Sequence, residues 1–259
     1  TLLYHKEKAF ENGVVNLDLE LVNNQNFTVL FWAQTNGNGA FDCDDLTNVT
    51  INPANLKANQ ENYAVFSGHD FIKSGQQFTG REIKLVRPVA QLNIATTAAS
   101  LASFDSPVEI EKSSVKLTGK LATSYNVATL AAGTATEVAF TYSEQEEPSD
   151  YFKTDYPYVA MNYVAFVDAD GENVKVDYTI KTSVGDITNT IGNVPLKPNY
   201  RTNILGNLIT ETSDYEVSLE ADWGGADEEV EVITDGLVKI NGVYNVSNAS
   251  CSSSQNRAR

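Results

Sequence analysis

The residues best suited to chemistry are few and scattered. The two histidines, His5 and His69, lie far apart, and the sequence has neither the H-x-x-x-H nor the H-E-x-x-H spacing of a zinc site. Asp70 follows His69, but a nucleophile–histidine–aspartate triad would also need a serine elbow such as G-x-S-x-G, which the sequence lacks. The sequence therefore predicts no catalytic residue, and we expect the chain not to be an enzyme.

Two acidic segments invite comparison with calcium sites. Residues 168–171 read DADG, but an EF-hand loop needs its glycine at the sixth position and a glutamate at the twelfth. Alternating residues flank this segment on both sides, so a hairpin turn is the favoured interpretation. Asp42, Asp44 and Asp45 lie in a turn-rich loop and could chelate calcium, although three loop acids in an acidic chain are weak evidence. We therefore predict no metal and no cofactor.

Aromatic side chains offer a different chemistry, because they can stack on sugar rings. Trp32 lies inside the apolar run 27–33 and is better explained as a core residue. Trp223 directly precedes Gly224 and Gly225, so it is either a core residue or the ligand-contacting aromatic of a binding surface. This residue keeps open an alternative function, that of a surface glycan-binding lipoprotein that does not polymerise.

Composition and charge narrow the range of partners. The chain has 259 residues, of which 42% are hydrophobic and 20% charged, so it can bury a core. Its formal net charge of −16 disfavours nucleic acid, whose backbone is bound through Lys and Arg. The two cysteines, Cys43 and Cys251, lie far apart and form no C-x-x-C motif, and a chain of this length needs no bridge. We therefore predict no disulfide.

The two ends of the sequence are unusual. Leu2, Leu3 and Tyr4 already read as a strand without a preceding start methionine, so we expect that the beginning has been removed. The tail at 250–259 is polar and breaks abruptly from what precedes it, as in a disordered, truncated or misread end. No stretch approaches the roughly 18 apolar residues of a membrane-spanning helix.

Period-two alternation dominates the rest of the chain. In residues 14–22, apolar and polar residues alternate as in a half-buried strand, and the Asn12-Gly13 turn predicts a hairpin with residues 6–10. Residues 27–33, FTVLFWA, are apolar throughout and predict a strand buried on both faces. Pro88 should lie at a bulge, an edge or a strand start.

The same pattern continues through the second half. Gly119 separates two strand-like segments, 108–117 and 121–130, which we interpret as a hairpin. Residues 174–181 alternate between apolar and polar, and the acidic segment 143–150 reads as a domain linker or a long loop within one domain. Many short strands separated by turns predict an all-β fold made of antiparallel β-sandwiches.

Four segments together resemble the fimbrillin family, the pilin-like surface proteins of Bacteroides-type bacteria. Residues 27–33, 87–93 (RPVAQLN), 158–163 (YVAMNY) and 199–210 (NYRTNILGNLIT) match such proteins in order and at plausible spacings. The resemblance spans roughly residues 14–223. It implies a fimbrial subunit with two transthyretin-like antiparallel β-sandwich domains in tandem. We place these domains at 1–145, with its first strands missing, and at 146–235, followed by a C-terminal extension at 236–259.

The resemblance also implies a mechanism of assembly. Members of the family are exported as lipoprotein precursors, and a protease removes an N-terminal strand after an arginine, which exposes an apolar groove. A donor strand from the neighbouring subunit then fills the groove. The lipobox cysteine and the processing arginine are absent from this sequence, and Arg81 and Arg87 lie mid-chain between predicted strands.

The C-terminal segments 229–233 and 237–246 are the donor-strand candidates. They are interpreted either as donors or as the final strands of the second domain. The candidate residues are Val230, Val232, Leu237, Val238, Ile240, Val243 and Tyr244. We therefore expect a fimbrial subunit at the cell surface or outer membrane. It would bind neighbouring subunits and support adhesion to a host or bacterial surface glycan or protein.

Overall fold

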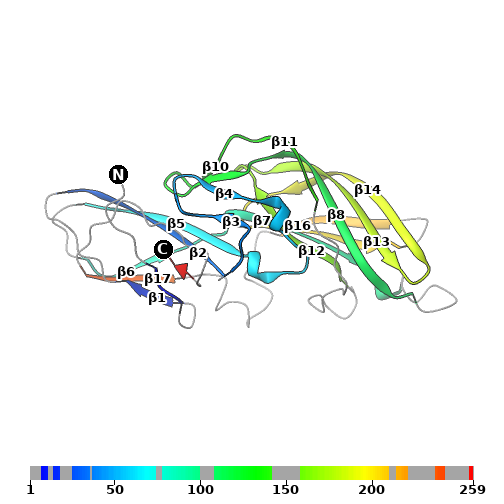
Figure 1. Cartoon of the computed structure of the whole chain (residues 1–259), viewed down its shortest axis with the longest axis horizontal. Coiled ribbons are helices and arrows are strands. Elements are labelled where there is room, and N and C mark those ends of the chain that lie inside the picture. Colours follow the sequence, from blue (N-terminus) through cyan, green and yellow to red (C-terminus); the bar gives the residue numbers. More distant parts are fainter. Residues whose placement is uncertain are drawn as a thin grey trace.

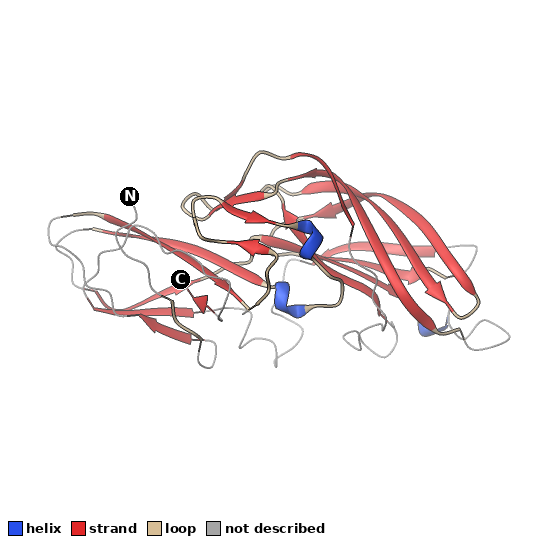
Figure 2. Ribbon diagram, in the orientation of Figure 1, coloured by secondary structure: helices blue, strands red, loops and turns tan. Residues whose placement is uncertain are grey.

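The structure is a computed structural model that describes residues 7–10, 14–17, 25–35, 37–73, 78–99, 108–141, 158–209, 214–220, 237–242 and 257–258. In this part of the chain the secondary structure is almost entirely β (Figure 2). Short 3₁₀ turns, η1 (Pro53–Asn55) and η2 (Glu61–Tyr63), lie between strands. The predicted all-β sandwich fold class is confirmed.

Two four-stranded sheets form the larger sandwich, which occupies the right half of Figure 1. One sheet has the order β11-β8-β13-β14 and is antiparallel. The other has the order β12-β7-β15-β16, in which β7 and β15 run parallel. The strands of the first sheet are β8 (Ile110–Leu121), β11 (Thr136–Thr141), β13 (Glu172–Thr182) and β14 (Gly185–Leu196). Those of the second are β7 (Val89–Thr96), β12 (Tyr158–Phe166), β15 (Arg201–Asn207) and β16 (Asp214–Glu220).

The core of this larger sandwich follows from the alternation of its strands. In β13, Val174, Val176, Tyr178 and Ile180 are buried, as the pattern of residues 174–181 predicts. They belong to the same hydrophobic cluster as Leu92, Ile94 and Ile204 of the opposing sheet. The hydroxyl of Thr202 also donates to the carbonyl of Pro195, so a hydrogen bond joins β15 to β14.

A smaller sandwich lies at the other end of the molecule (Figure 1). Its sheets have the orders β1-β17-β6 and β18-β2-β5. Between them lies a second hydrophobic cluster that includes Val15, Leu17, Phe31 and Ile83. The strands are β1 (Val14–Leu17), β2 (Phe27–Gln34), β5 (Val65–Ile72), β6 (Phe78–Lys84), β17 (Leu237–Gly242) and β18 (Arg257–Ala258).

Strand β2 contributes to both cores, which explains why its sequence is apolar throughout. Val29, Phe31 and Ala33 belong to the smaller core, whereas Leu30 and Trp32 belong to the larger one. The prediction that residues 27–33 form a strand buried on both faces is confirmed. Trp32 is fully buried, as expected of a core residue, and its ring centroid lies 5.9 Å from that of Phe41.

A third small sheet with the order β10-β9-β4-β3 packs against the Trp32 side of β2. Its strands are β3 (Phe41–Asp42), β4 (Val49–Ile51), β9 (Ser124–Asn126) and β10 (Ala131–Ala132). The ring centroids of Trp32 and Tyr125 are 6.4 Å apart, and those of Tyr125 and Phe166 are 5.2 Å apart. These aromatic contacts join β2 to the larger sandwich.

The hairpin predicted around Gly119 is wrong. Residues 110–121 form one uninterrupted strand, β8, which pairs with β11 and β13. Gly119 is present because the neighbouring strand approaches closely, since a Cβ built there would lie 2.7 Å from Cγ1 of Val174. A glycine in a strand can therefore mark close packing instead of a turn.

The turn predicted at Asp170-Gly171 is present, but it does not make a hairpin. Gly171 N donates to the carbonyl of Asp168 over 2.9 Å, and Gly171 has a φ of +91°. The strands on either side lie in different sheets, because β12 pairs with β7 whereas β13 pairs with β8 and β14. The turn thus carries the chain from one layer of the sandwich to the other.

Strands that precede the linker predicted at residues 143–150 pair with strands that follow it. The linker itself lies outside the described residues. Strands β7 and β8 precede it, and their partners β12 and β13 follow it. The boundary predicted at residue 145 therefore separates strands that share a sheet. The proposed division into two domains remains a prediction.

Two local features bear on other expectations. Pro88 immediately precedes β7, so it lies at a strand start, as predicted. Cys43 is disulfide-bonded, which contradicts the expectation of no disulfide. Separation along the sequence was a poor guide because folding brings distant segments together. The other cysteine of the chain, Cys251, lies outside the described residues.

Candidate strand-exchange site

Strand β17 lies in the middle of a sheet whose other strands come from the beginning of the chain. It pairs in parallel with β1 and antiparallel with β6, so both of its edges are hydrogen-bonded. The order β1-β17-β6 means that this late segment separates two early strands (Figure 1). Three donor-strand candidates, Leu237, Val238 and Ile240, lie in β17.

The register aligns the alternation of β17 with the buried positions of its neighbours. Val238 is the register partner of Val15 and Ile240 that of Leu17, and both residues of β1 are buried. On the other side, Val238 is opposite the buried Ile83. Lys239 is opposite the exposed Asn16 and Glu82. A slip of one residue would reverse this correspondence, so the apolar pattern specifies the register.

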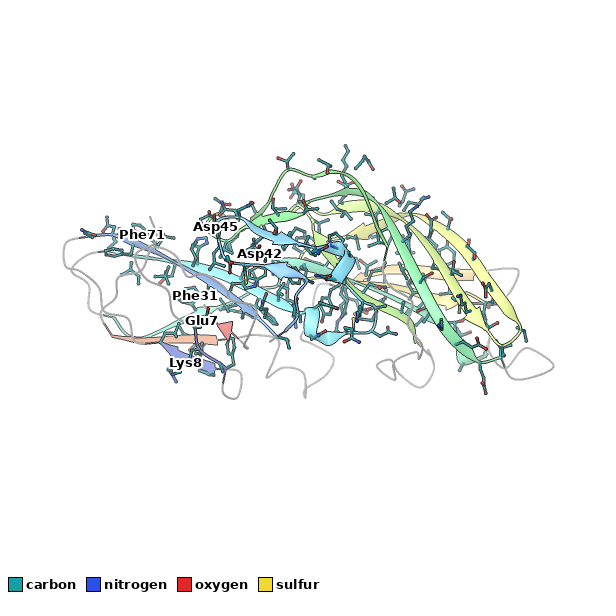
Figure 3. The ribbon with its side chains drawn as sticks, viewed as in Figure 1. Glu7, Lys8, Phe31, Asp42, Asp45 and Phe71 are labelled. Atoms are coloured by element: carbon teal, nitrogen blue, oxygen red, sulfur yellow. The ribbon has the colours of Figure 1, made fainter. Side chains whose placement is uncertain are left out.

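Beneath these strands lies the smaller core. Phe31, labelled in Figure 3, is fully buried and belongs to the same cluster as Val15, Leu17 and Ile83. Since β1 and β6 both contribute to this cluster, β17 completes one wall of the small sandwich. Without β17, β1 and β6 would be left on either side of a slot about 9.6 Å wide, twice the usual spacing between strands.

Such a slot would present unpaired backbone groups along two edges. Unpaired N–H and C=O groups on strand edges template the addition of another strand. Strand β1 also accepts a side-chain hydrogen bond, because Lys8 Nζ donates to the carbonyl of Asn16 over 3.0 Å. With β17 withdrawn, the site would be a backbone-binding slot in which alternate apolar positions set the specificity.

The remaining site residues predicted from the sequence are not placed by the structure. Val230, Val232, Val243 and Tyr244 lie outside the described residues, as does the possible ligand aromatic Trp223. Whether Leu237, Val238 and Ile240 act as a donor strand remains a prediction, because their pairing here is within one chain.

The residues considered for catalysis or metal binding show ordinary structural contacts. His69 Nδ1 lies 3.2 Å from the carbonyl oxygen of Val127, an arrangement in which the ring donates. Asp42 and Asp45 accept hydrogen bonds within their own loop, from Asp44 N and Thr47 N respectively. Over the described ranges, no group of three or more His, Cys, Asp or Glu side chains could hold a metal ion.

The sequence predicts extended structure in both regions that flank β17, but it does not predict that β17 lies between them. The alternation in residues 14–22 was recognised, but the partner expected for it was the segment at 6–10 across Asn12-Gly13, a turn outside the described residues. The partner in the structure is β17. The extended stretch predicted from the sequence at 82–95 overlaps the second flanking strand, β6, and its alternate residues Ile83 and Leu85 are buried.

A family model described as a family of unknown function, DUF6562, matches residues 3–246. This chain belongs to the DUF6562 family. The match includes both β1 and β17, so the strands of the slot lie within the family's extent. No curated protein matches this DUF6562 chain.

Two solved structures from Bacteroides are similar to this DUF6562 chain. A putative cell adhesion protein from Bacteroides ovatus shares 13% identity at a TM-score of 0.37, over 67% of this chain and 59% of that one. A putative cell adhesion protein from Bacteroides uniformis shares 14% identity at a TM-score of 0.34, over 78% of this chain and 68% of that one. This chain thus spans little more than half the length of the first of these proteins.

Among the described residues, no helix is long and apolar enough to span a membrane.

Proposed function

We propose that this DUF6562 chain is a structural, pilin-like subunit of a bacterial surface fimbria. Neighbouring subunits assemble by β-strand addition, and the assembly supports adhesion at the cell surface or outer membrane. The chain acts by pairing its backbone with its neighbours and not as an enzyme. The resemblance of residues 27–33, 87–93, 158–163 and 199–210 to fimbrillins supports this proposal.

The observation that carries the proposal is the position of β17. A segment near the end of the sequence occupies the centre of a sheet and is paired on both sides with strands from the beginning. A second copy of the chain offers the same backbone groups and the same apolar alternation. Exchange of β17 between copies would therefore form the same ladders without requiring any new interface.

The physical balance favours exchange when subunits are concentrated. The ladders that β17 forms within its own chain and those it would form with a second copy are chemically equivalent. Their relative stability therefore depends on effective concentration and on strain in the connecting chain. Because the donor of one subunit fills the slot of the next, the contact is heterologous and can propagate into a fibre. The formal net charge of −16 opposes non-specific association of the subunits.

The test compares two variants of the full chain that change its charge equally. In Val238→Asp/Ile240→Asp, carboxylates replace the residues opposite the buried Val15 and Leu17. In Lys239→Asp the change falls opposite the exposed Asn16. We expect concentrated wild-type protein and Lys239→Asp to form oligomers or fibres by size-exclusion chromatography and negative-stain imaging, and the double variant to remain monomeric.

Two results would contradict the proposal. One is a wild-type chain that stays monomeric at high concentration after processing of its termini. The other is oligomers of equal size in the wild type and in Val238→Asp/Ile240→Asp, since their contacts would then not involve the apolar alternation of β17.

A further inference from the structure

The outward face of the β11-β8-β13-β14 sheet is rich in lysine. Alternate residues of β8 and β13 point to the larger core, for example Val115, Leu117 and Val176, so the residues between them lie on the opposite face. That face, here called the lysine face, carries Lys112, Lys116, Lys120, Lys175 and Lys181.

The lysine face is cationic although the whole chain is acidic. Its five lysines share the face, at register positions of this sheet, with the carboxylates of Glu137, Asp177 and Asp186, and the exposed Glu111 lies beside Lys112 at the register shift of β8. Lys116, Lys120 and Lys175 are exposed to solvent. The acidic excess of the chain, whose formal net charge is −16, therefore lies elsewhere.

The central carboxylate of the lysine face is already engaged. Asp177 accepts a hydrogen bond from Thr190 Oγ1 over 2.6 Å and forms an ion pair with Lys175 Nζ at 3.0 Å. These contacts, the Thr190 hydrogen bond first, hold the pKa of Asp177 below its ordinary value, with a smaller contribution from the charge of Lys116. Within the described residues, Lys116 and Lys120 form no ion pair of their own.

An acidic counterpart lies on a different part of the molecule. Asp42 ends β3, Asp44 and Asp45 follow it on the loop to β4, and all three are exposed; Figure 3 labels Asp42 and Asp45. Asp42 Oδ1 accepts from Asp44 N over 3.1 Å, and Asp45 Oδ1 accepts from Thr47 N over 2.8 Å. These short-range bonds fix the loop and leave the three carboxylates facing solvent.

We infer that the lysine face binds the 42–45 loop of a second copy of this chain. Charge complementarity supports this occupant, because Asp42, Asp44 and Asp45 are exposed carboxylates that the lysines would attract. Face and loop are different surfaces, so the contact is heterologous and repeats from copy to copy. It is separate from strand exchange, because neither surface includes β1, β6 or β17.

The contact has a physical signature that strand exchange lacks. It consists of exposed charges, so salt should weaken it strongly, and it should form and dissociate rapidly. An exchanged strand is held by two backbone ladders and persists in salt. Sedimentation velocity of the full chain at about 0.01 M and about 1 M salt, where the screening length is about 30 Å and about 3 Å, therefore distinguishes the two contacts.

Two charge-reversal variants test the two surfaces. The face variant is Lys116→Glu/Lys120→Glu. The loop variant is Asp42→Asn/Asp44→Lys/Asp45→Asn, in which asparagine keeps the side-chain oxygens that accept from Asp44 N and Thr47 N. Each should weaken low-salt association by more than about tenfold. The control Lys57→Glu/Lys73→Glu makes the same charge change at two exposed lysines outside the lysine face and should associate less than tenfold differently from wild type.

Mixing and combining the variants gives the decisive result. The face variant has glutamates on the face and keeps the acidic loop, whereas the loop variant keeps the lysine face and has one lysine and no aspartate at positions 42, 44 and 45. Neither should associate alone at low salt, but an equimolar mixture should recover association. A single chain carrying both sets of changes should recover it as well, because its glutamates meet its own copy's lysine loop.

Several outcomes would overturn the inference. One is salt-sensitive association that survives in the face variant, and another is a mixture that stays monomeric. A third is a wild-type chain that is monomeric at low salt and is retained on sulfated dextran, while the face variant is not retained. That result would make a polyanion the occupant of the lysine face. If the only oligomers are salt-resistant and are lost in Val238→Asp/Ile240→Asp, the association is strand exchange and the lysine face takes no part in it.

Discussion

Gly119 of β8 lies directly against Val174 of β13, so close that a Cβ on the glycine would lie 2.7 Å from Val174 Cγ1. The two residues belong to neighbouring strands of one sheet, and both are buried. The contact lets β8 and β13 pack tightly at the point where the register between β13 and β14 shifts, between Val174 and Val176.

We therefore predict that Gly119→Ala destabilises the fold. The added methyl must displace Val174, and overpacking of this kind costs about 1–3 kcal/mol. Chemical denaturation monitored by tryptophan fluorescence would measure the loss. Val174→Ala in the Gly119→Ala background should recover part of it. Gly192→Ala is the control, since a Cβ there meets nothing within 4 Å, and its effect should stay within about 0.5 kcal/mol.

A second prediction concerns two buried amides. Asn93 Nδ2 donates to Asn203 Oδ1 over 2.8 Å, and both side chains are buried in the β12-β7-β15-β16 sheet. Asn203→Leu should cost about 1–3 kcal/mol, because it removes the acceptor of a buried donor. In Asn93→Leu/Asn203→Leu the loss should be smaller than the sum of the single losses. Strict additivity in this double-mutant cycle would show that the amides do not interact.

The receiving strand of the slot gives a third prediction. Leu17 is buried in the smaller core, so Leu17→Ala should cost about 2–5 kcal/mol. It should also loosen β17, the register partner of β1, which limited proteolysis would detect as faster cleavage near residues 237–242. The neighbouring exposed position supplies the control, and Asn16→Ala should leave cleavage unchanged.

Alkaline pH should unfold the protein in part through Tyr125. Burial raises the pKa of Tyr125 above its ordinary value of 10.0, and the hydrogen bond from Ser67 opposes this effect. A raised pKa means that the folded state favours the neutral phenol. The associated stability is therefore complete below about pH 10 and is lost as the pH rises toward the folded-state pKa.

Tyr125→Phe should accordingly flatten the alkaline limb of the stability curve, measured by denaturation at successive pH values. The limb should not disappear, because burial also raises the pKa of Tyr63 and of Tyr178. An unchanged slope above pH 10 in the variant would argue against this role of Tyr125.

The sequence was informative wherever local alternation determined the structure. The strand at residues 27–33, the alternating residues 174–181 and the position of Pro88 all followed from side-chain periodicity or from the missing amide proton of proline. These features depend on which face of a strand is buried, and a short window of sequence contains that information.

Features that depend on distant partners could not be read in this way. The reason for Gly119 lies on β13, and the turn at Asp170-Gly171 joins two sheets that the sequence does not distinguish from one. The same holds for the slot, since nothing near Val15 indicates that its neighbour is Val238. The apolar alternation at 237–240 identified the strand but not its place.

The placement of β17 between β1 and β6 has a consequence for how the chain matures. Strand β1 cannot pair with β17 until residues 237–242 have been synthesised, and pairing over such a sequence distance is slow. The apolar residues Val15 and Leu17 therefore lack this strand partner until β17 has been made. We expect a newly made chain to be most prone to aggregation during this interval, while these apolar residues lack their strand partner.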